Sequence, residues 1–399
     1  MNKVEKYLTD NWKNCVRENR EDKGNLLGLP YKYTVPAIGH FEEIYYWDTY
    51  FTNVGLLKFD CAELAKNNVD DMLYMVDKYG FMPNGSRSFY LTRSQPPFLS
   101  EMVRDVYEYY RDRVWLIGAY ETLKKEYKFW SEKRTLPIGL NHYDSEYPNK
   151  EKHVEGFIKR VGYRPDLTDD EIAHHSLATC ESGWDMNPRW DFEAYNFAAV
   201  DLNCLLYRME TNMSYFADIL GKTDETALWK ERSGERYALM LKYLLDENKI
   251  FMDYNYLTDA HSSVFSVASY FPLYVKMATA EQAAVLVENL SRLEEEYGVS
   301  TCEKQESSID YQWGYPNGWA CLQHIMIVGL DNYGYKEEAK RIAKKYIDLA
   351  DKVFDETGNL WEKYNVVEGN INVSKEYVMP PMFGWSAGVY VFCKEYLSK

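Results

Sequence analysis

Residues 181–196, with the sequence ESGWDMNPRWDFEAYN, combine two tryptophans, several carboxylic acids and an arginine in one short stretch. Gly183 and Pro188 interrupt any helical period, so the stretch is predicted to be a loop between regular elements. The tryptophans could simply cover an edge of the core. Alternatively, an aromatic loop with a carboxyl group inside it is typical of a sugar-binding cleft.

Five further loops share this mixture of aromatic, amide and charged residues. They span residues 38–51, 82–98, 310–320, 360–366 and 374–388. Their polar residues include Glu42, Glu43, Asp48, Asn84, Arg87, Arg93, Gln95, Gln312, Glu362 and Glu376. A pyranose needs aromatic faces for its C–H surface, and amide, guanidinium or carboxylate groups for its hydroxyls. The loops are therefore suited to bind a sugar.

Cleavage of a glycosidic bond requires two more groups. A carboxylic acid must protonate the leaving oxygen, and a carboxylate must activate water or attack carbon. These loops contain carboxyl groups for both roles, whereas the sequence has no GxSxG, GxGxxG, P-loop or HExxH pattern. The adjacent His174 and His175 would point apart in a helix or strand, so no metal site is expected. The residues favour a glycosidase.

The elements between these loops are predicted to be helices. Apolar residues near i, i+3, i+4 and i+7 predict helices over residues 61–80, 101–130, 198–221, 226–245, 279–293, 316–334 and 335–358. The best strand candidate is KIFMDYNY, residues 249–256, as part of a small hairpin. Helix pairs could repeat around a ring or along a solenoid, and a closed ring is favoured because it gathers its loops at one end.

Composition limits the classes of partner that this 399-residue chain is expected to bind. Its formal net charge of -16 argues against nucleic acid and anionic membranes, and no stretch approaches 18 apolar residues. The polar N-terminal sequence has no apolar signal-peptide region, so a cytoplasmic location is expected. The seven cysteines are scattered, without metal-ligand spacing, and are expected to be reduced, half-buried thiols. A small neutral sugar is the expected partner, with the oligomeric state left open.

Six loop sequences resemble, in order and spacing, the successive motifs of the trehalase family of glycoside hydrolases. They are FEEIYYWDTYF, PNGSRSFYLTRSQPPF, ESGWD, QWGYPNGWA, EKYNV and FGWSAGV, over about residues 30–390. The resemblance implies an all-α, (α/α)6 toroidal barrel, predicted as one domain over residues 1–399. It also implies single displacement with inversion at the anomeric carbon, and no metal or organic cofactor.

The resemblance also assigns the catalytic residues. The family's general acid is the Asp of its GWD motif, which matches Asp185, and its general base is the Glu of its EKY motif, which matches Glu362. Asp185 is expected to be protonated near neutral pH through burial under Trp184, while Glu362 stays ionised. An inverting pair is expected to lie about 6.5–9.5 Å apart, which leaves room for water.

A larger set matches the family's glucose-holding residues, namely Phe41, Tyr45, Trp47, Asp48, Asn84, Arg93, Trp313 and Trp319. The remaining predicted substrate-binding residues, several of which could instead be structural supports, are Arg87, Gln95, Trp184, Arg189, Gln312, Glu376 and Trp385.

Five positions bear on the leaving group, and four of them depart from the family pattern. GHFEE replaces the usual GRFRE, so His40 and Glu42 stand at two arginine positions. Asn149 stands where another arginine is expected, Glu151 keeps an acid, and Gly314 replaces the Asp of QWD. The arginines are associated with the leaving-group sugar. The donor glucose pocket is therefore expected to be kept and the leaving-group pocket to be changed.

The predicted function is an inverting, trehalase-like hydrolase that releases glucose from trehalose or a related small α-glucoside. One alternative is hydrolysis of another α-glucoside, such as glucosylglycerate or an α-linked glucobiose. A second is a non-catalytic sugar-binding protein on the same barrel. The presence of both Asp185 and Glu362 argues against the second, because a binding protein has no use for an opposed acid and base.

Overall fold

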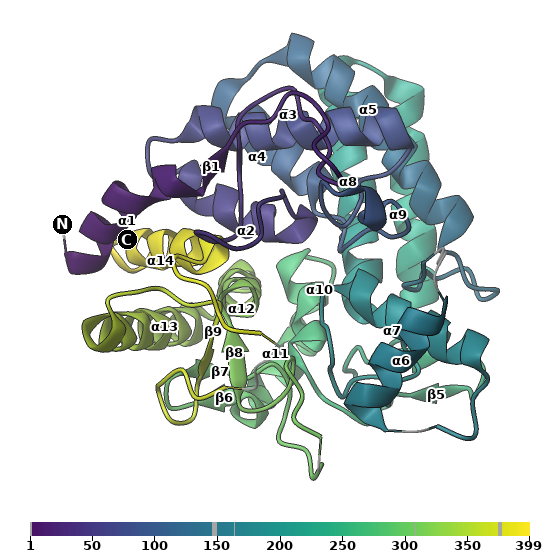
Figure 1. Cartoon of the computed structure of the whole chain (residues 1–399). Coiled ribbons are helices and arrows are strands. Elements are labelled where there is room, and N and C mark those ends of the chain that lie inside the picture. The colour runs from purple at the N-terminus through teal and green to yellow at the C-terminus, as the bar shows by residue number, and fades with distance from the viewer. Residues whose placement is uncertain (1, 146–149, 163, 308, 374–376) are drawn as a thin grey trace.

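The computed structural model describes residues 2–145, 150–162, 164–307, 309–373 and 377–399. Helices dominate this part of the chain (Figure 1). They are α1 (Lys3–Asn11), α2 (Tyr46–Leu56), α3 (Ala62–Tyr79), α4 (Leu99–Tyr110), α5 (Arg113–Lys133), α6 (Lys150–Val161), α7 (Asp169–Ser182), α8 (Val200–Leu220), α9 (Thr223–Tyr243), α10 (Phe271–Tyr274), α11 (Ala280–Glu288), α12 (Ala320–Asn332), α13 (Lys336–Thr357) and α14 (Gly384–Leu397). None of the helices within these ranges is long and apolar enough to pass through a lipid bilayer.

Six of these helices form a closed inner ring. The helices α2, α4, α8, α10, α12 and α14 contact one another in this order, and α14 returns to pack along α2. Outside them, α3 packs on α2 and α4, α5 on α4 and α8, α9 on α8, and α13 on α12 and α14 (Figure 1). The chain thus alternates between outer and inner helices, with α6 and α7 inserted between α5 and α8. The predicted all-α, (α/α)6 toroid is confirmed.

One predicted helix, over residues 101–130, is two helices in the structure. Arg111 adopts a left-handed φ of 56° and ends α4. The Asp112 side chain then accepts a hydrogen bond from the backbone N–H of Trp115, at 3.0 Å, and caps α5. The apolar period continues across this turn, which is why the sequence pattern did not reveal it. The break allows α4 to join the inner ring while α5 packs outside.

The strands are short and antiparallel. They form the pairs β1 (Val16–Arg17) with β2 (Tyr33–Thr34), β6 (Glu294–Glu295) with β7 (Gly298–Val299) and β8 (Asn317–Trp319) with β9 (Lys363–Asn365), and a ribbon of β3 (Phe197–Ala198), β4 (Tyr254–Asn255) and β5 (Ala260–His261). The predicted strand at residues 249–256 contains only β4, which lies between β3 and β5. In the β8–β9 pair, Trp319 lies directly opposite Lys363.

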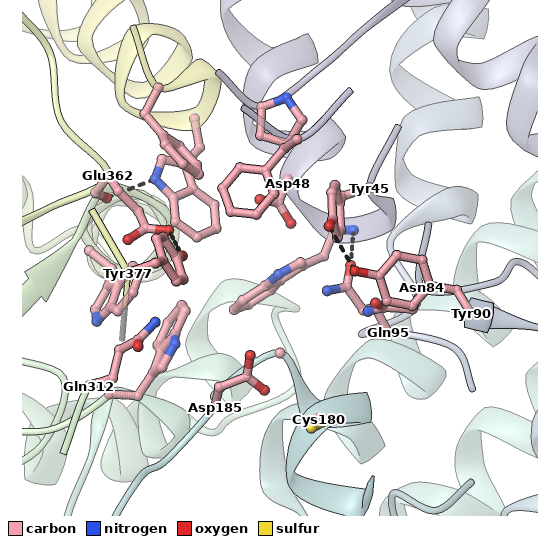
Figure 2. Close-up of a pocket in the computed structure, with 18 of the residues that line it drawn as sticks. Tyr45, Asp48, Asn84, Tyr90, Gln95, Cys180, Asp185, Gln312, Glu362 and Tyr377 are labelled. Atoms are coloured by element: carbon pink, nitrogen blue, oxygen red, sulfur yellow. Dashed lines mark hydrogen bonds between the residues drawn. The ribbon is translucent and has the colours of Figure 1, made fainter. Parts of the chain in front are cut away.

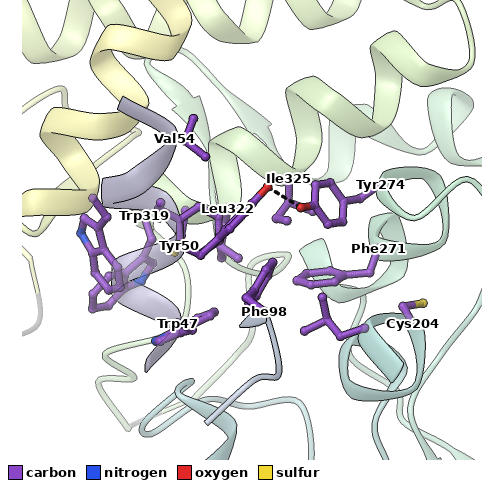
Figure 3. Close-up of a cluster of buried hydrophobic side chains, with 14 of the residues drawn as sticks. Trp47, Tyr50, Val54, Phe98, Cys204, Phe271, Tyr274, Trp319, Leu322 and Ile325 are labelled. Carbon is purple, nitrogen blue, oxygen red and sulfur yellow. Dashed lines mark hydrogen bonds between the residues drawn. The ribbon is translucent and has the colours of Figure 1, made fainter. Parts of the chain in front are cut away.

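Aromatic and aliphatic side chains fill the space between the inner helices (Figure 3). The hydroxyls of Tyr50 and Tyr274 are hydrogen-bonded at 2.6 Å, and Phe98 stacks on Tyr50 with ring centroids 4.5 Å apart. Trp47 and Trp319 belong to the same buried cluster and also line the cavity described below. Five cysteines are buried, more deeply than predicted: Cys15, Cys204, Cys302, Cys321 and Cys393. Core and cavity therefore share side chains.

The ring closes where α2 and α14 cross at very short range. A Cβ atom on Gly388 would lie 2.0 Å from the carbonyl oxygen of Phe51, and one on Gly55 would lie 2.5 Å from the Cα atom of Gly388. Both distances are far below van der Waals contact, so neither position has room for a side chain. The N-terminal segment also contacts α14, where Asn2 Nδ2 donates to the Tyr390 hydroxyl at 2.7 Å.

Replacement of Gly388 by alanine should therefore destabilise the protein. The added methyl group would force the backbones of α2 and α14 apart, and overpacking of this kind costs about 1–3 kcal/mol or more. Gly118→Ala is the matched control, because Gly118 also lies within a helix but nothing surrounds its Cβ position within 4 Å. That change should be neutral or stabilising, since alanine is the better helix former. Urea denaturation of both variants measures the difference, and equal stability would contradict the constraint.

Candidate active site

A cavity of about 160 Å³ opens at one end of the ring. Three inner helices begin at its wall: Asp48 lies in the first turn of α2, Trp319 is the N-cap residue of α12, and Trp385 lies in the first turn of α14. The loop after α7 supplies Asp185, and Glu362 precedes β9. Helix N-termini carry partial positive charge, which favours carboxylates near them. The loops that lead into the inner helices thus build the site.

Among the described residues, three carboxyl groups face the cavity, those of Asp48, Asp185 and Glu362 (Figure 2). Glu362 is 2% exposed, and its Oε2 accepts a hydrogen bond from Lys363 Nζ at 3.0 Å. Its Oε1 accepts from the Tyr377 hydroxyl. Burial and the charge of Glu362 raise the pKa of Tyr377, so this hydroxyl stays protonated and donates. Figure 2 shows Glu362 and Asp185 on different walls of the cavity.

Asp48 has a strongly perturbed carboxyl group. Burial, the negative charge of Glu362 and, to a smaller extent, that of Asp185 together raise its pKa to about 8. Like charges that share one site disfavour ionisation of all of them. Asp48 is therefore mostly protonated at neutral pH and can donate a hydrogen bond to a ligand.

Tryptophans form the apolar part of the wall. Trp313 stacks on Trp319, with ring centroids 3.7 Å apart and planes at 5°. Trp385 meets both edge-on, at 6.1 and 5.6 Å, and Trp47 lies 5.4 Å from Trp313. Such broad aromatic faces suit the C–H surface of a sugar ring.

Gly183 allows two parts of this wall to meet. It ends α7 with a φ of 71°, and a Cβ atom there would lie 2.8 Å from the Trp47 indole. Only glycine combines that conformation with that proximity. The tryptophan wall consequently packs against the backbone that leads to Asp185.

Some polar atoms of the cavity wall have no hydrogen-bond partner within the described ranges. They include Arg93 Nε and Gln312 Oε1, both of which are buried. The Arg93 guanidinium packs over the Tyr90 ring at 5.0 Å, and the Tyr90 and Tyr45 hydroxyls are joined at 2.7 Å. A buried donor or acceptor without a partner costs free energy. A ligand rich in hydroxyl groups would satisfy these atoms.

A buried carboxylate behind the wall fixes its loops. Glu181, in the last turn of α7, accepts two hydrogen bonds from Arg134 at 2.8 and 3.0 Å. It also accepts from the backbone N–H groups of Ser94, at 2.7 Å, and Asp144, at 2.8 Å. Ser94 stands between two residues of the cavity wall, so this anchor ties them to the helix that precedes Asp185.

Comparison with known proteins identifies the family. The family model described as Trehalase matches residues 1–398. The chain belongs to the trehalase family. Among solved structures, neutral trehalase Nth1 from Saccharomyces cerevisiae matches with a TM-score of 0.80 and 30% sequence identity, over 92% of this chain and 74% of the yeast chain. Together, the family model and this structure identify a glycoside hydrolase.

More distant structures share the fold alone. The GH63 mannosylglycerate hydrolase from Thermus thermophilus, in complex with Tris and D-glycerate, matches with a TM-score of 0.69 and 16% identity, over 98% of this chain and 100% of that chain. A rhamnosidase from Klebsiella oxytoca with rhamnose bound matches with a TM-score of 0.60 and 13% identity, over 99% of this chain and 63% of that chain.

The structure brings most of the residues matched to trehalase motifs together in the cavity. Those that line it are Phe41, Tyr45, Trp47, Asp48, Asn84, Arg93, Gln95, Asp185, Gln312, Trp313, Trp319, Glu362 and Trp385. Asn149 and Glu376 lie outside the described residues.

Two predicted substrate-binding residues lie behind the cavity wall, in the loop that carries Asp185. Trp184 is buried and packs 5.5 Å from the cavity residue Trp313. Arg189 is also buried, between the rings of Trp184 and Trp190, and is ion-paired with Asp201 and Asp253. These side chains support the loop around Asp185.

Arg87 likewise affects the cavity wall only through another side chain. Its Nε lies 3.0 Å from Glu43 Oε1, which also accepts from the Tyr45 hydroxyl at 2.9 Å. Arg87 therefore supports Tyr45 from behind and does not line the cavity.

His40, Glu42 and Glu151, the described members of the predicted leaving-group set, do not line the cavity either. His40 is exposed, with its ring 4.3 Å from Phe41 and 5.9 Å from Tyr377. Glu42 is bound by Arg17, which lowers the pKa of Glu42. Glu151 is exposed on α6, which packs against α7. The sequence could place these residues near the site but could not give their partners.

The sequence did not single out several residues of the site. Tyr377, Tyr90, Cys180, Phe383 and Pro36 line the cavity, and Lys363 binds Glu362. Tyr377, Phe383 and Tyr90 lie within the aromatic loops, and Lys363 is the central residue of the EKY motif, so motif membership was the available signal. The sequence did not show the direction in which each side chain points.

Asp48→Asn should change how stability depends on pH. The folded-state pKa of Asp48, about 8, lies above the ordinary value of about 3.9. Its contribution to stability is therefore fully present below about pH 4 and lost as the pH rises through about 8. The Tm of the wild type should fall more steeply over this range than that of the variant. Circular dichroism melts from about pH 4 to 9 test this, with the exposed Asp10→Asn as control, and equal slopes for the wild type and Asp48→Asn would refute it.

Proposed function

We propose that this trehalase-family protein is an inverting hydrolase that releases glucose from a small α-glucoside. The observation that carries the proposal is the pair of carboxyl groups of Asp185 and Glu362, on different walls of a tryptophan-lined cavity. The cavity residues suit a neutral sugar, and the family is one of glycoside hydrolases. A single domain over residues 1–399 and a cytoplasmic location stay predictions.

In the proposed reaction the two carboxyl groups act on opposite faces of the sugar. Asp185 gives its proton to the glycosidic oxygen as the bond from that oxygen to C1 breaks. Glu362 takes a proton from a water molecule whose oxygen attacks C1 from the other face. An α-glucoside therefore yields β-glucose. This mechanism calls for carboxyl groups about 6.5–9.5 Å apart.

The donor glucose would complete the polar wall of the cavity. Arg93 Nε and Gln312 Oε1, which have no partner in the described residues, can bind its hydroxyls, and protonated Asp48 can donate to another. The stacked Trp313 and Trp319 offer a face for its C–H surface. Each group matches one requirement of a pyranose.

The surroundings of His40 favour a substrate other than trehalose. An arginine presents a rigid fork of donors that can hold two hydroxyls, and an imidazole cannot reproduce it. The imidazole of His40 packs against Phe41 and Tyr377, and Glu42 is held by Arg17. Another α-glucoside, such as glucosylglycerate or an α-linked glucobiose, is therefore the alternative substrate. A non-catalytic sugar-binding protein is the alternative class.

Purified protein incubated with a panel of α-linked glucosides tests the proposal. We expect glucose release, and proton NMR during the first turnovers should show the β-anomer before mutarotation. Release of α-glucose would overturn inversion. Binding of glucosides without any hydrolysis would favour the sugar-binding alternative.

Asp185→Asn and Glu362→Gln should each lower kcat by at least about a hundredfold, the usual scale for loss of a general acid or base. Both changes are nearly isosteric, so both variants should still fold, but Glu362→Gln leaves the buried Lys363 ammonium without its partner and should lower the Tm. An aryl glucoside with a good leaving group should restore the activity of Asp185→Asn more than that of Glu362→Gln, because only the acid assists departure. The exposed Glu368→Gln is the matched control and should keep wild-type turnover. Near-normal activity of either site variant would show that the replaced residue is not the general acid or the general base.

Trehalose should be a poor substrate or none, and another α-glucoside should be cleaved faster. A site built to bind a particular hydroxyl discriminates strongly, so the loss of arginine donors changes which leaving group fits. His40→Arg should raise the ratio of kcat/KM for trehalose to that for the preferred glucoside. His261→Arg, at an exposed histidine on β5, should not. This prediction would be contradicted if trehalose had the highest kcat/KM of the panel, at about 10⁴ M⁻¹s⁻¹ or more.

A further inference from the structure

Lys363 occupies an unusual position for a lysine. It begins β9 directly opposite Trp319 of β8, and it is 1% exposed. Its ammonium lies 4.6 Å from the Trp319 ring centroid and 5.7 Å from that of Tyr377. The long side chain thus ends between two rings of the active-site wall, beside Glu362.

The ammonium of Lys363 and the carboxylate of Glu362 form a buried ion pair. Nζ lies 3.0 Å from Oε2, and the exposed fractions of the two side chains are 1% and 3%. Within the described ranges this is the sole ion pair of either residue. Removal of two charges from water is costly, and loss of one partner leaves the other uncompensated. Each charge is therefore compensated by the other.

Among the described residues, the other titratable groups near Glu362 are acidic or neutral, and the cationic Arg93 of the same cavity wall packs over the Tyr90 ring. Asp48 of α2 and Asp185 after α7 are carboxyl groups that face the same cavity, and the Cys321 thiol of α12 lies near Asp48 and Glu362. Tyr377 is neutral and donates a hydrogen bond. Lys363 supplies the positive charge that an ionised Glu362 needs.

The same contacts orient the carboxylate. Lys363 holds Oε2, Tyr377 holds Oε1, and the Trp385 indole N–H donates to the backbone carbonyl of Glu362 at 2.8 Å. A carboxylate has about four lone-pair sites, so about two remain for water after these two side-chain bonds.

We propose that Lys363 is a positioning residue for the general base: it keeps Glu362 ionised and fixes the direction in which Glu362 accepts the proton of water. This inference rests on the proposed hydrolase function. Lys363 reaches the reaction through Glu362 alone, because it does not line the cavity.

The test compares the wild type with Lys363→Met, which retains the bulk of the side chain without its charge. We expect kcat to fall at least about a hundredfold and KM to change less than about threefold. Without a counter-ion, Glu362 should hold its proton to higher pH, so the acidic limb of the pH–rate profile should move up by about one pH unit or more. The matched control, Lys345→Met, removes a lysine paired with Glu294 at 2.8 Å on the outer helix α13 and should change neither quantity.

Stability measurements separate this role from a purely structural one. Lys363→Met should lose more Tm at about pH 8 than at about pH 5, because the unpaired carboxylate is buried when ionised. The double variant Lys363→Met with Glu362→Gln removes both charges, so its Tm loss relative to the wild type should be smaller and should not differ between the two pH values. If Lys363→Met folds poorly, the double variant provides the stability comparison with the wild type in its place.

The outcomes distinguish the two proposals. Hydrolysis by the wild type, with an unchanged acidic limb in Lys363→Met, overturns the role of Lys363. A Tm loss that is equal at both pH values and not relieved by Glu362→Gln overturns it as well. Absence of hydrolysis by the wild type would refute the proposed function, and the Tm comparison would then decide whether Lys363 keeps Glu362 ionised.

Discussion

The crossing of α2 and α14 is the constraint on which the rest of the structure depends. The two backbones meet at Gly55 and Gly388, and the first and last inner helices thereby close the ring. This contact places Asp48 and Trp47, near the start of α2, beside Trp385, near the start of α14. Residues from opposite ends of the sequence become neighbours in one cavity wall. Without ring closure the inner helices would have no common end at which to gather loops.

Buried charge is used in two ways around this cavity. Behind the wall, Arg134 with Glu181 of α7, and Arg189 with Asp201 of α8 and with Asp253, tie loops to neighbouring helices and loops. Each carboxylate there is paired with an arginine, so the loops are held by directional bonds with little freedom to shift.

At the cavity itself, acidic side chains lie close together. Among the described residues, Asp48, Asp185 and Glu362 face it, and Lys363 pairs with Glu362. Burial, together with the negative charge of Glu362, raises the pKa of Asp48, so the carboxyl groups lie in different environments. Acid–base catalysis needs groups of the same type in different protonation states, and unequal partners are the physical means to produce them.

The sequence by itself determined much about this protein. Helical periodicity predicted the long helices, because an amphipathic period is a local property, and six ordered motifs were enough to predict the family and the fold. The same motifs named most residues that line the cavity. The sequence missed the turn at Arg111, since the apolar period runs across it, and it could not identify Tyr377 and Lys363 as partners of Glu362.

Tertiary structure alone decided which matched residues reach the cavity. Arg189 and Arg87 turn away to bind carboxylates, and Glu42 is held by Arg17, 25 positions earlier in the chain. A side chain turns toward its strongest available partner, and that partner is set by the packing of distant segments. Residue types and their order are local and can be found in the sequence, whereas direction, burial and pairing depend on the whole ring.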